Sequence, residues 1–352
     1  MCIRDRFICV AGNDGKDIDN TKNYPASFKH SNMIVVGSSD SNDQKAGSSN
    51  YGVNTVDLFA PGVNIYSTVP NGYANLSGTS MAAPQVTGVA ALIKARYPNA
   101  PASMIKNRIL GSVDRVSSLN KYCKTGGRLN AYKALQNTRI SLEAPMNVSM
   151  TFNSQKTFHE FTAPKTDYYT FKTTSSNGVV SSENILYDSS GRIITGSGST
   201  SYLQYKLNAG QKYYFESGML YTFGKYILTI YDSTTANGAI RIGTNREYDV
   251  NISEAGQKRW YVYRPSMASH KYTIFSLNNG SSDPTGRLYE SQNLIEPVLK
   301  EIAYNDDANA PDRNFSMTQS LLSGRDYYIE AGCYGNNTGL YNIRTNTHVV
   351  YN

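Results

Sequence analysis

The chain lacks several features that would point to a particular class of protein. Its four cysteines are too few and too widely spaced to define a disulfide framework, and they match no metal-binding motif: Cys2, Cys9, Cys123 and Cys333. No run approaches about 18 consecutive apolar residues, which excludes a membrane-spanning helix within this sequence. We find no signal peptide, and no cluster of Lys and Arg with interleaved aromatic residues indicates a nucleic-acid surface.

The composition is that of an ordinary globular protein. Hydrophobic residues make up 39% and charged residues 17% of the 352 residues, a length that allows two or three domains. The 34 basic and 27 acidic side chains give a net charge of +7, but they are scattered along the chain. We interpret this diffuse charge as a solvated surface, and we expect neither an organic cofactor nor a metal at the main site.

The most informative segment is the run of small residues around Ser80, between Gly78 and Pro84. Small neighbours let the backbone approach a substrate carbonyl, and a helix that starts at the serine points free N–H groups at an oxyanion formed there. Apolar residues recur at helical spacing after Pro84, which we place in the first helical turn, and we expect the helix to end near Tyr97–Pro98. Taken alone, such a serine most often belongs to an ordinary loop.

Four segments in a fixed order distinguish these alternatives: Val10–Asn13, Ile34–Gly37, Phe59–Gly62 and Gly78–Pro84. Ala82 stands where the α/β-hydrolase motif has its second glycine, so the serine is not of that type. The four segments together resemble the subtilisin-like serine proteases, and the resemblance covers residues 7–137. It implies an α/β fold, here an incomplete parallel sheet with flanking helices, and a serine endopeptidase that hydrolyses peptide bonds through an acyl-enzyme.

The resemblance also implies roles for individual residues. Ser80 would be the nucleophile, Asn13 would form the oxyanion hole with the Ser80 N–H, and Gly12 would bind substrate. Asn13 follows the apolar run Phe7–Ala11, which we predict to be a buried parallel strand, so it would lie at the carboxyl end of the sheet. The alternative is that residues 12–15 form a simple turn.

Further elements are predicted after this loop. We expect buried strands at residues 33–37 and 56–59, a helix over residues 101–110, and a glycine turn followed by a final helix at residues 126–131.

The general base that a serine nucleophile needs is not evident. The family orders its triad Asp, His, Ser, yet all four histidines follow Asn13, and none stands in the family's setting: His30, His159, His270 and His348. We interpret His30 as an exposed loop residue. We therefore expect that the chain is the C-terminal part of a longer precursor, that this part alone is inactive, and that an apolar sheet edge is exposed around residues 7–11.

The second part of the chain belongs to a different class. Residues 1–137 hold seven of the 28 tyrosines, and the rest of the chain holds 21. Short alternating strands separated by Gly, Asn and Ser turns predict all-β antiparallel sandwiches. We predict three domains: a peptidase portion at residues 1–137, a first β-sandwich at 138–240 and a second at 241–352.

The two predicted sandwiches are copies of one unit. Residues 155–158 and 186–189 recur at an offset of 102, and residues 209–216 recur at an offset of 114. Each copy resembles the bacterial pre-peptidase C-terminal domain, which implies an extracellular protein and contact with a cell surface or polysaccharide. The insertion in the second copy carries Asp306, Asp307 and Asp312, which predict either a calcium site or a plain solvated turn.

The sequence thus predicts a secreted endopeptidase that acts on protein or peptide substrates, with no nucleic-acid partner and no membrane span. The alternative is a non-catalytic secreted binding or adhesion protein that carries an inert protease remnant.

Overall fold

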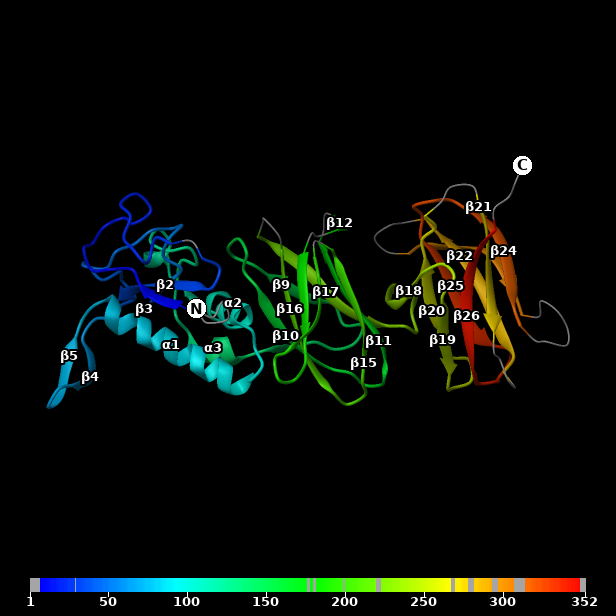
Figure 1. Ribbon diagram of the computed structural model, residues 1–352, viewed down its shortest axis with the longest axis horizontal. Helices are drawn as coiled ribbons and strands as arrows, with labels where there is room; N and C mark the ends of the chain where they lie inside the picture. The colour runs from blue at the N-terminus through cyan, green and yellow to red at the C-terminus, as the bar shows by residue number, and fades with distance from the viewer. Residues whose placement is uncertain are drawn as a thin grey trace.

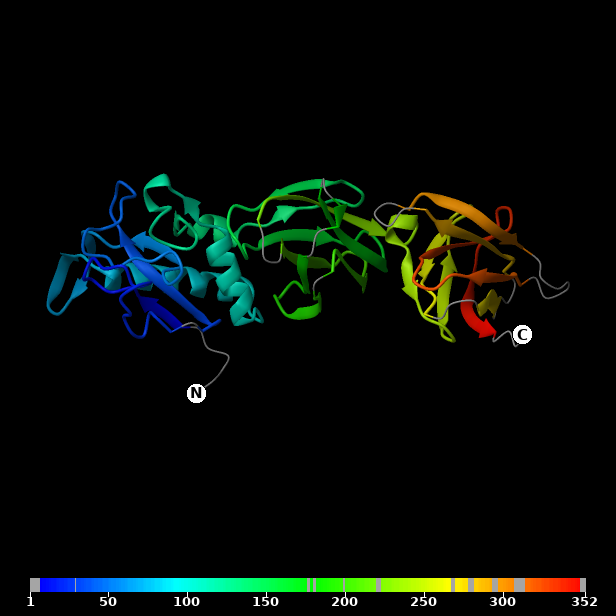
Figure 2. The same cartoon turned by 90° about the horizontal axis from the view of Figure 1, so that it is seen from above.

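The computed structural model describes most of the chain, in the following ranges: 7–28, 30–175, 178–179, 182–198, 200–219, 223–266, 270–277, 282–292, 297–306 and 314–348. Three parts follow one another along the long axis of the molecule (Figure 1), and the view from above shows the same row (Figure 2). We call them the α/β part (residues 7–137), the first β-region (138–239) and the second β-region (240–348).

The α/β part is built on one five-stranded sheet in the order β1-β2-β3-β7-β6. Its strands are β1 (Phe7–Val10), β2 (Met33–Ser39), β3 (Leu58–Pro61), β6 (Asp114–Arg115) and β7 (Gly127–Arg128). Strands β1, β2, β3 and β7 run parallel, and β2 is buried at every position because it lies inside the sheet. The strand predicted at residues 33–37 is confirmed as buried. The one predicted at residues 7–11 is confirmed as a parallel strand, but of its four residues only Cys9 is buried, because β1 lies at the edge of the sheet. The strand predicted at residues 56–59 begins two residues later and extends to Pro61.

Three helices flank this sheet: α1 (Thr79–Arg96), α2 (Ala102–Gly111) and α3 (Ala131–Leu135). The predicted end of α1 is confirmed, since Tyr97 caps it, but the placement of Pro84 is wrong. Helix α1 begins at Thr79, so Pro84 lies in its second turn. A proline is tolerated there because its missing N–H removes only the bond to the Ser80 carbonyl, close to the helix start.

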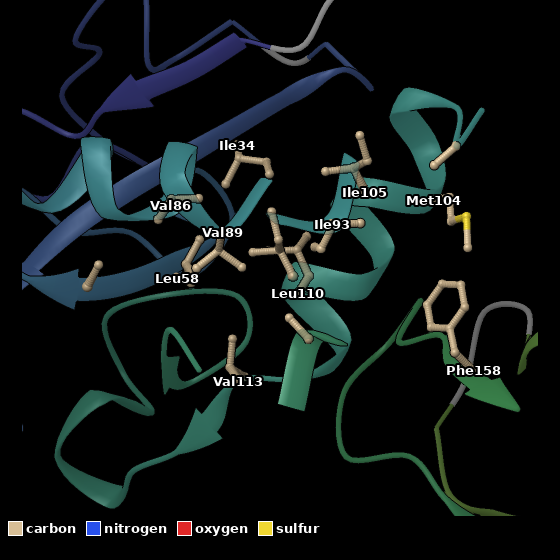
Figure 3. Close-up of a cluster of buried hydrophobic side chains, with 14 of the residues drawn as sticks. Ile34, Leu58, Val86, Val89, Ile93, Met104, Ile105, Leu110, Val113 and Phe158 are labelled. Carbon is tan, nitrogen blue, oxygen red and sulfur yellow. The ribbon is translucent and has the colours of Figure 1, made fainter. Parts of the chain in front are cut away.

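The remaining short elements of this part are the hairpin β4 (Ile65–Val69) and β5 (Gly72–Leu76) and the 3-10 helix η1 (Ser117–Leu119). The hairpin leads directly into α1. Figure 3 shows how side chains of α1 and α2 pack between the sheet and Phe158, which belongs to the first β-region. The core of the α/β part is therefore completed by the next part of the chain.

The first β-region consists of two five-stranded sheets that enclose one apolar cluster. Its elements are β8 (Thr138–Arg139), β9 (Met146–Ser149), β10 (Thr157–Thr162), β11 (Asp167–Ser175), β12 (Gly178–Val179), β13 (Ser182–Tyr187), β14 (Ile193–Ser197), β15 (Tyr202–Leu207), β16 (Lys212–Met219), β17 (Lys225–Asp232) and the 3-10 helix η2 (Ala236–Gly238). Phe171 of one sheet stacks on Phe215 of the other, with ring centroids 4.6 Å apart.

The second β-region also has two sheets around its own apolar cluster. Its strands are β18 (Ile240–Ile242), β19 (Glu247–Ile252), β20 (Arg259–Tyr263), β21 (His270–Leu277), β22 (Pro284–Ser291), β23 (Leu299–Asn305), β24 (Ser316–Leu321), β25 (Tyr327–Cys333) and β26 (Gly339–His348).

The sequence repeat is also a repeat of strand order. One sheet runs β14-β13-β16-β10-β8 in the first region and β23-β22-β25-β20-β18 in the second. Both copies shift register at the same place, after Leu186 and after Leu288, which are 102 residues apart. The bulge is thus part of the repeated unit.

Arg108 of α2 joins the α/β part to the first β-region. Its guanidinium lies 4.3 Å from the ring centre of Tyr97 and 4.2 Å from that of Phe158, and only 2% of the residue is exposed. The neighbouring Asn107 donates to the buried carboxylate of Glu216 over 2.7 Å. Rings on both sides of a desolvated cation hold the two parts together.

Candidate active site

The side chain of Asn13 lies at the N-terminus of α1, beside the predicted nucleophile. Its Oδ1 accepts hydrogen bonds from the Thr79 N–H over 2.9 Å and from the Thr79 hydroxyl over 3.1 Å. Because an amide oxygen only accepts, these two bonds fix the orientation of the carboxamide. Its Nδ2 remains available to donate to a substrate oxygen.

Ser80 is the second residue of α1, and its side chain is exposed. The first N–H groups of a helix have no partner within the helix. Asn13 takes the Thr79 N–H, and Gly78 takes that of Met81, whereas the Ser80 N–H and hydroxyl bind no other described residue. Two donors, one from a side chain and one from the backbone, therefore flank an exposed hydroxyl.

Glycines allow the chain to pass from β3 to this helix start. Gly78 has φ +151°, and a Cβ there would lie 3.4 Å from the Asn13 amide. Its N–H donates to the Gly62 carbonyl over 2.7 Å, and Gln85 Nε2 of α1 donates to the Pro61 carbonyl over 2.6 Å. The end of β3 therefore fixes the start of α1.

Gly12 is required by the packing of the loop that carries Asn13. Its φ is +101°, and a Cβ would lie 2.3 Å from Asn23 Nδ2 and 2.5 Å from Asn50 Nδ2. No side chain fits there without moving both amides.

Asn50 positions this loop and was missed by the sequence reasoning. The residue is fully buried; its Nδ2 donates to the Ala11 carbonyl over 3.0 Å, and its Oδ1 accepts the N–H groups of Asp14 (3.0 Å) and Lys16 (2.9 Å). These bonds hold the backbone on both sides of Asn13. An isolated asparagine 37 positions away carries no signal in a single sequence.

In the part of the chain that the structure describes, no hydrogen bond joins Ser80 to His30 or His159, and the side chains of His270 and His348 lie outside that part. The prediction that His30 is exposed is confirmed, and its ring lies 6.2 Å from that of Phe28. His159 lies inside the first β-region, where burial lowers its pKa to about 4 and its Nε2 lies 2.9 Å from the Thr157 hydroxyl. His270 and His348 belong to β21 and β26 of the second β-region.

Strand β1 forms one edge of the described sheet, as expected. Phe7 is 50% exposed there, whereas Cys9 is buried, and its burial raises the pKa of the thiol. Cys9, Cys123 and Cys333 are buried free thiols, and Cys2 lies outside the described residues.

The predicted calcium ligands are only partly within the described residues. The Asp306 carboxylate accepts a hydrogen bond from the Tyr304 hydroxyl over 3.2 Å, while Asp307 and Asp312 lie outside. Among the residues that the structure describes, no three His, Cys, Asp or Glu side chains gather as metal ligands would. In the same part of the chain, no helix combines the length and apolar character needed to cross a membrane.

Comparison with known proteins finds similarity to one family over the α/β part and the beginning of the first β-region. Residues 6–175 match the model of the subtilase family, Peptidase S8. Thermitase of Thermoactinomyces vulgaris is 46% identical over 130 residues, which are 37% of this chain and 43% of the relative. Subtilisin DY of Bacillus licheniformis is 41% identical over 131 residues, 37% of this chain and 46% of the relative.

One solved structure, described as a cold adapted subtilisin-like serine proteinase, is 36% identical, with 36% of this chain and 43% of that chain covered and a TM-score of 0.30. The chain spans less than half the length of these relatives. The family match extends past α3 into the strands of the first β-region as far as Ser175.

Proposed function

We propose that the α/β part belongs to a serine endopeptidase that cleaves peptide bonds through an acyl-enzyme on Ser80. The observation that carries this proposal is the bond between Asn13 Oδ1 and the Thr79 N–H, which holds the free amide donor next to the serine. The similarity of residues 6–175 to subtilases, including thermitase and subtilisin DY, supports it.

In this mechanism Ser80 Oγ attacks the scissile carbonyl, and negative charge develops on the carbonyl oxygen. Asn13 Nδ2 and the Ser80 N–H donate to that oxygen, and the N-terminus of α1 adds favourable potential. These donors are held by the fold before substrate arrives, so little reorganisation is needed when the charge forms. Gly12, next to Asn13, would present its backbone to the peptide.

The attack requires a base, and we propose that none of the four histidines of this chain serves as one. His30 lies on the surface beside Phe28, and His159, His270 and His348 belong to the β-regions. We therefore propose that these 352 residues alone are inactive and that the triad Asp and His come from outside this sequence.

The test is to complete the site with a relative. The part of thermitase that precedes its similarity to this chain is fused before Phe7, and hydrolysis of a peptide ester is measured. We expect turnover by the fusion and none by residues 1–352 alone. Ser80→Ala should abolish turnover, and Asn13→Ala should lower kcat about 10²–10³-fold, a magnitude established on a subtilisin and carried over here.

Two outcomes would contradict the proposal. Turnover that survives Ser80→Ala would remove the serine from the mechanism. A folded but inactive fusion would favour the non-catalytic binding protein. Leu92→Ala, at a 51% exposed position far from the start of the same helix, is the matched control and should leave kcat within about threefold.

We also propose that the two β-regions are sandwich domains of the pre-peptidase C-terminal type and that the protein acts outside the cell. Their shared strand order and the subtilisin-like relatives support this. Export of the full precursor into the culture medium, followed by immunoblot, is the direct test.

A further inference from the structure

A cleft between the two β-regions has the chemistry of a ligand site that the peptidase mechanism does not use. Its volume is about 550 Å³, within the usual range of small-ligand sites. One wall comes from β11, β15 and residues 236–239 of the first β-region. The other comes from β18, β20 and β25 of the second.

The two walls are fixed relative to one another by polar contacts. The buried guanidinium of Arg259, from the second region, donates to the buried carboxylate of Asp167 and, over 2.9 Å, to the Ser233 hydroxyl of the first. Gln204 Oε1 accepts the Arg241 N–H over 3.1 Å across the cleft itself. The cleft is therefore formed before any ligand binds.

The charged side chains of the cleft favour an anion. Lys172, Arg241 and Arg264 line it together with a single carboxylate, that of Asp326. Arg264 donates to Asp326 through Nε (2.8 Å) and Nη2 (2.7 Å), and Arg241 Nη1 donates to the same carboxylate over 3.4 Å. Burial raises the pKa of the Asp326 carboxyl, but the two arginines outweigh burial and lower that pKa. With Asp326 ionised, the lining side chains carry a net charge of about +2 at neutral pH.

The remaining lining residues favour a sugar over a peptide. Tyr202 presents a 38% exposed ring, 5.8 Å from the Arg241 guanidinium. Hydroxyl and amide side chains line the cleft as well, and its aliphatic side chains are small: Thr170, Thr200, Ser201, Gln204, Asn237 and Tyr328 against Ala236, Ala239 and Val262. The hydroxyl groups of a sugar can bond to these polar side chains, and the apolar face of its ring can stack on Tyr202. An apolar peptide side chain would find no deep apolar pocket here.

We propose that this cleft binds an acidic oligosaccharide, with its carboxylate or sulfate on Arg241 and Arg264 and a sugar ring stacked on Tyr202. The inference concerns the β-regions only and is independent of the reaction at Ser80.

The test is calorimetric titration of the full chain with four probes. Tetragalacturonate and a heparin tetrasaccharide are the acidic sugars, maltotetraose is the neutral sugar, and tetraglutamate is an anion without sugar rings. We expect at least one acidic sugar to bind at least tenfold more tightly than both maltotetraose and tetraglutamate, and its affinity to fall as salt is raised. Failure of both acidic sugars to bind, or equal binding of tetraglutamate, would overturn the proposal.

Variants locate the binding in the cleft. Tyr202→Ala and Arg241→Gln should each weaken binding of the acidic sugar about tenfold or more, which corresponds to the loss of one good contact. Tyr205→Ala is the matched control, since Tyr205 lies on the same strand, is 40% exposed and does not line the cleft. With melting temperatures unchanged, equal affinities for all three variants would place the binding elsewhere and refute the assignment.

Discussion

At the scale of single residues, the buried carboxamide of Asn50 holds the loop that presents Asn13. Asn50→Ala removes one donor and one acceptor and leaves the Ala11 carbonyl and two backbone N–H groups with fewer partners. We expect the free energy of unfolding to fall by about 2–3 kcal/mol, measured by urea denaturation. Asn42→Ala, at an exposed loop position, is the control and should change it by less than about 0.5 kcal/mol. Equal losses in both variants would contradict this role.

The buried His159 makes stability depend on pH. Its folded pKa of about 4 lies below the ordinary value of 6.5, so between these values the unfolded chain binds a proton that the folded chain does not. The free energy of unfolding should therefore be highest above about pH 6.5. It should fall by on the order of 3 kcal/mol as the pH is lowered to 4 and the unfolded chain takes up this proton.

The measurement compares urea unfolding of the parent and of His159→Gln between pH 7 and pH 4. The difference between the two proteins should shrink as the pH falls. For His30→Gln, which changes an exposed histidine, the free energy of unfolding should follow that of the parent across this pH range. If the same holds for His159→Gln, the His159 ring does not cause the pH dependence.

The two residues that we propose to carry the chemistry could be named from the sequence, but the residues that hold them in place could not. Ser80 and Asn13 lie within short runs whose residue types are restricted by the chemistry. Asn50 and Thr79 act through bonds that exist only after residues far apart in the chain meet. Nothing local distinguishes a buried asparagine that positions a loop from one in a solvated turn.

At the scale of elements, two helical glycines have opposite surroundings. A Cβ on Gly88 of α1 would meet nothing within 4 Å, whereas one on Gly111 of α2 would lie 2.3 Å from the Lys156 carbonyl oxygen. We expect Gly88→Ala to raise the free energy of unfolding by about 0.5–1 kcal/mol, because alanine gives the unfolded chain fewer backbone conformations than glycine does. Gly111→Ala should lower it by about 1–3 kcal/mol, since α2 must move away from β10. Denaturant titration of both variants measures this, and a gain from Gly111→Ala would show that the helix has room to shift.

The elements themselves were predicted unevenly, for physical reasons. Strands β1 and β2 follow from apolar runs, which can be recognised without knowing the neighbouring strands. Pro84 was placed in the first turn of α1 because proline is typical of that position. No local signal shows that the helix begins at Thr79, where Asn13 accepts the first backbone N–H. A cap that comes from a residue far away in the sequence cannot be recognised from the residues around the helix start.

At the scale of the whole molecule, two buried arginines join successive parts of the chain. Arg108 links the α/β part to the first β-region, and Arg259 links the second β-region to the first. Within the described residues all α-helices lie in the α/β part, and the chain has a single tryptophan, Trp260, in the second β-region. Helical circular dichroism therefore reports on the α/β part, and tryptophan fluorescence reports on the second β-region where it meets the first.

We expect Arg259→Met to lower the free energy of unfolding, followed by tryptophan fluorescence, by about 3–5 kcal/mol. The substitution leaves the Asp167 carboxylate buried without its main partner. Arg108→Met should act chiefly on the helical signal. Arg246→Met, at an exposed position, is the control for both. Identical shifts of both signals in both variants would show that the molecule unfolds as one unit.

The two β-regions meet what precedes them through the same sheet. Strand β10 lies against α2 of the α/β part, and its counterpart β20 lies against the end of the first β-region, where the Trp260 N–H donates to the Ser233 carbonyl over 2.8 Å. These head-to-tail contacts repeat in one direction, and the three parts lie in a row along the long axis of the molecule (Figure 1). The second copy of the β unit therefore lengthens the molecule instead of widening it.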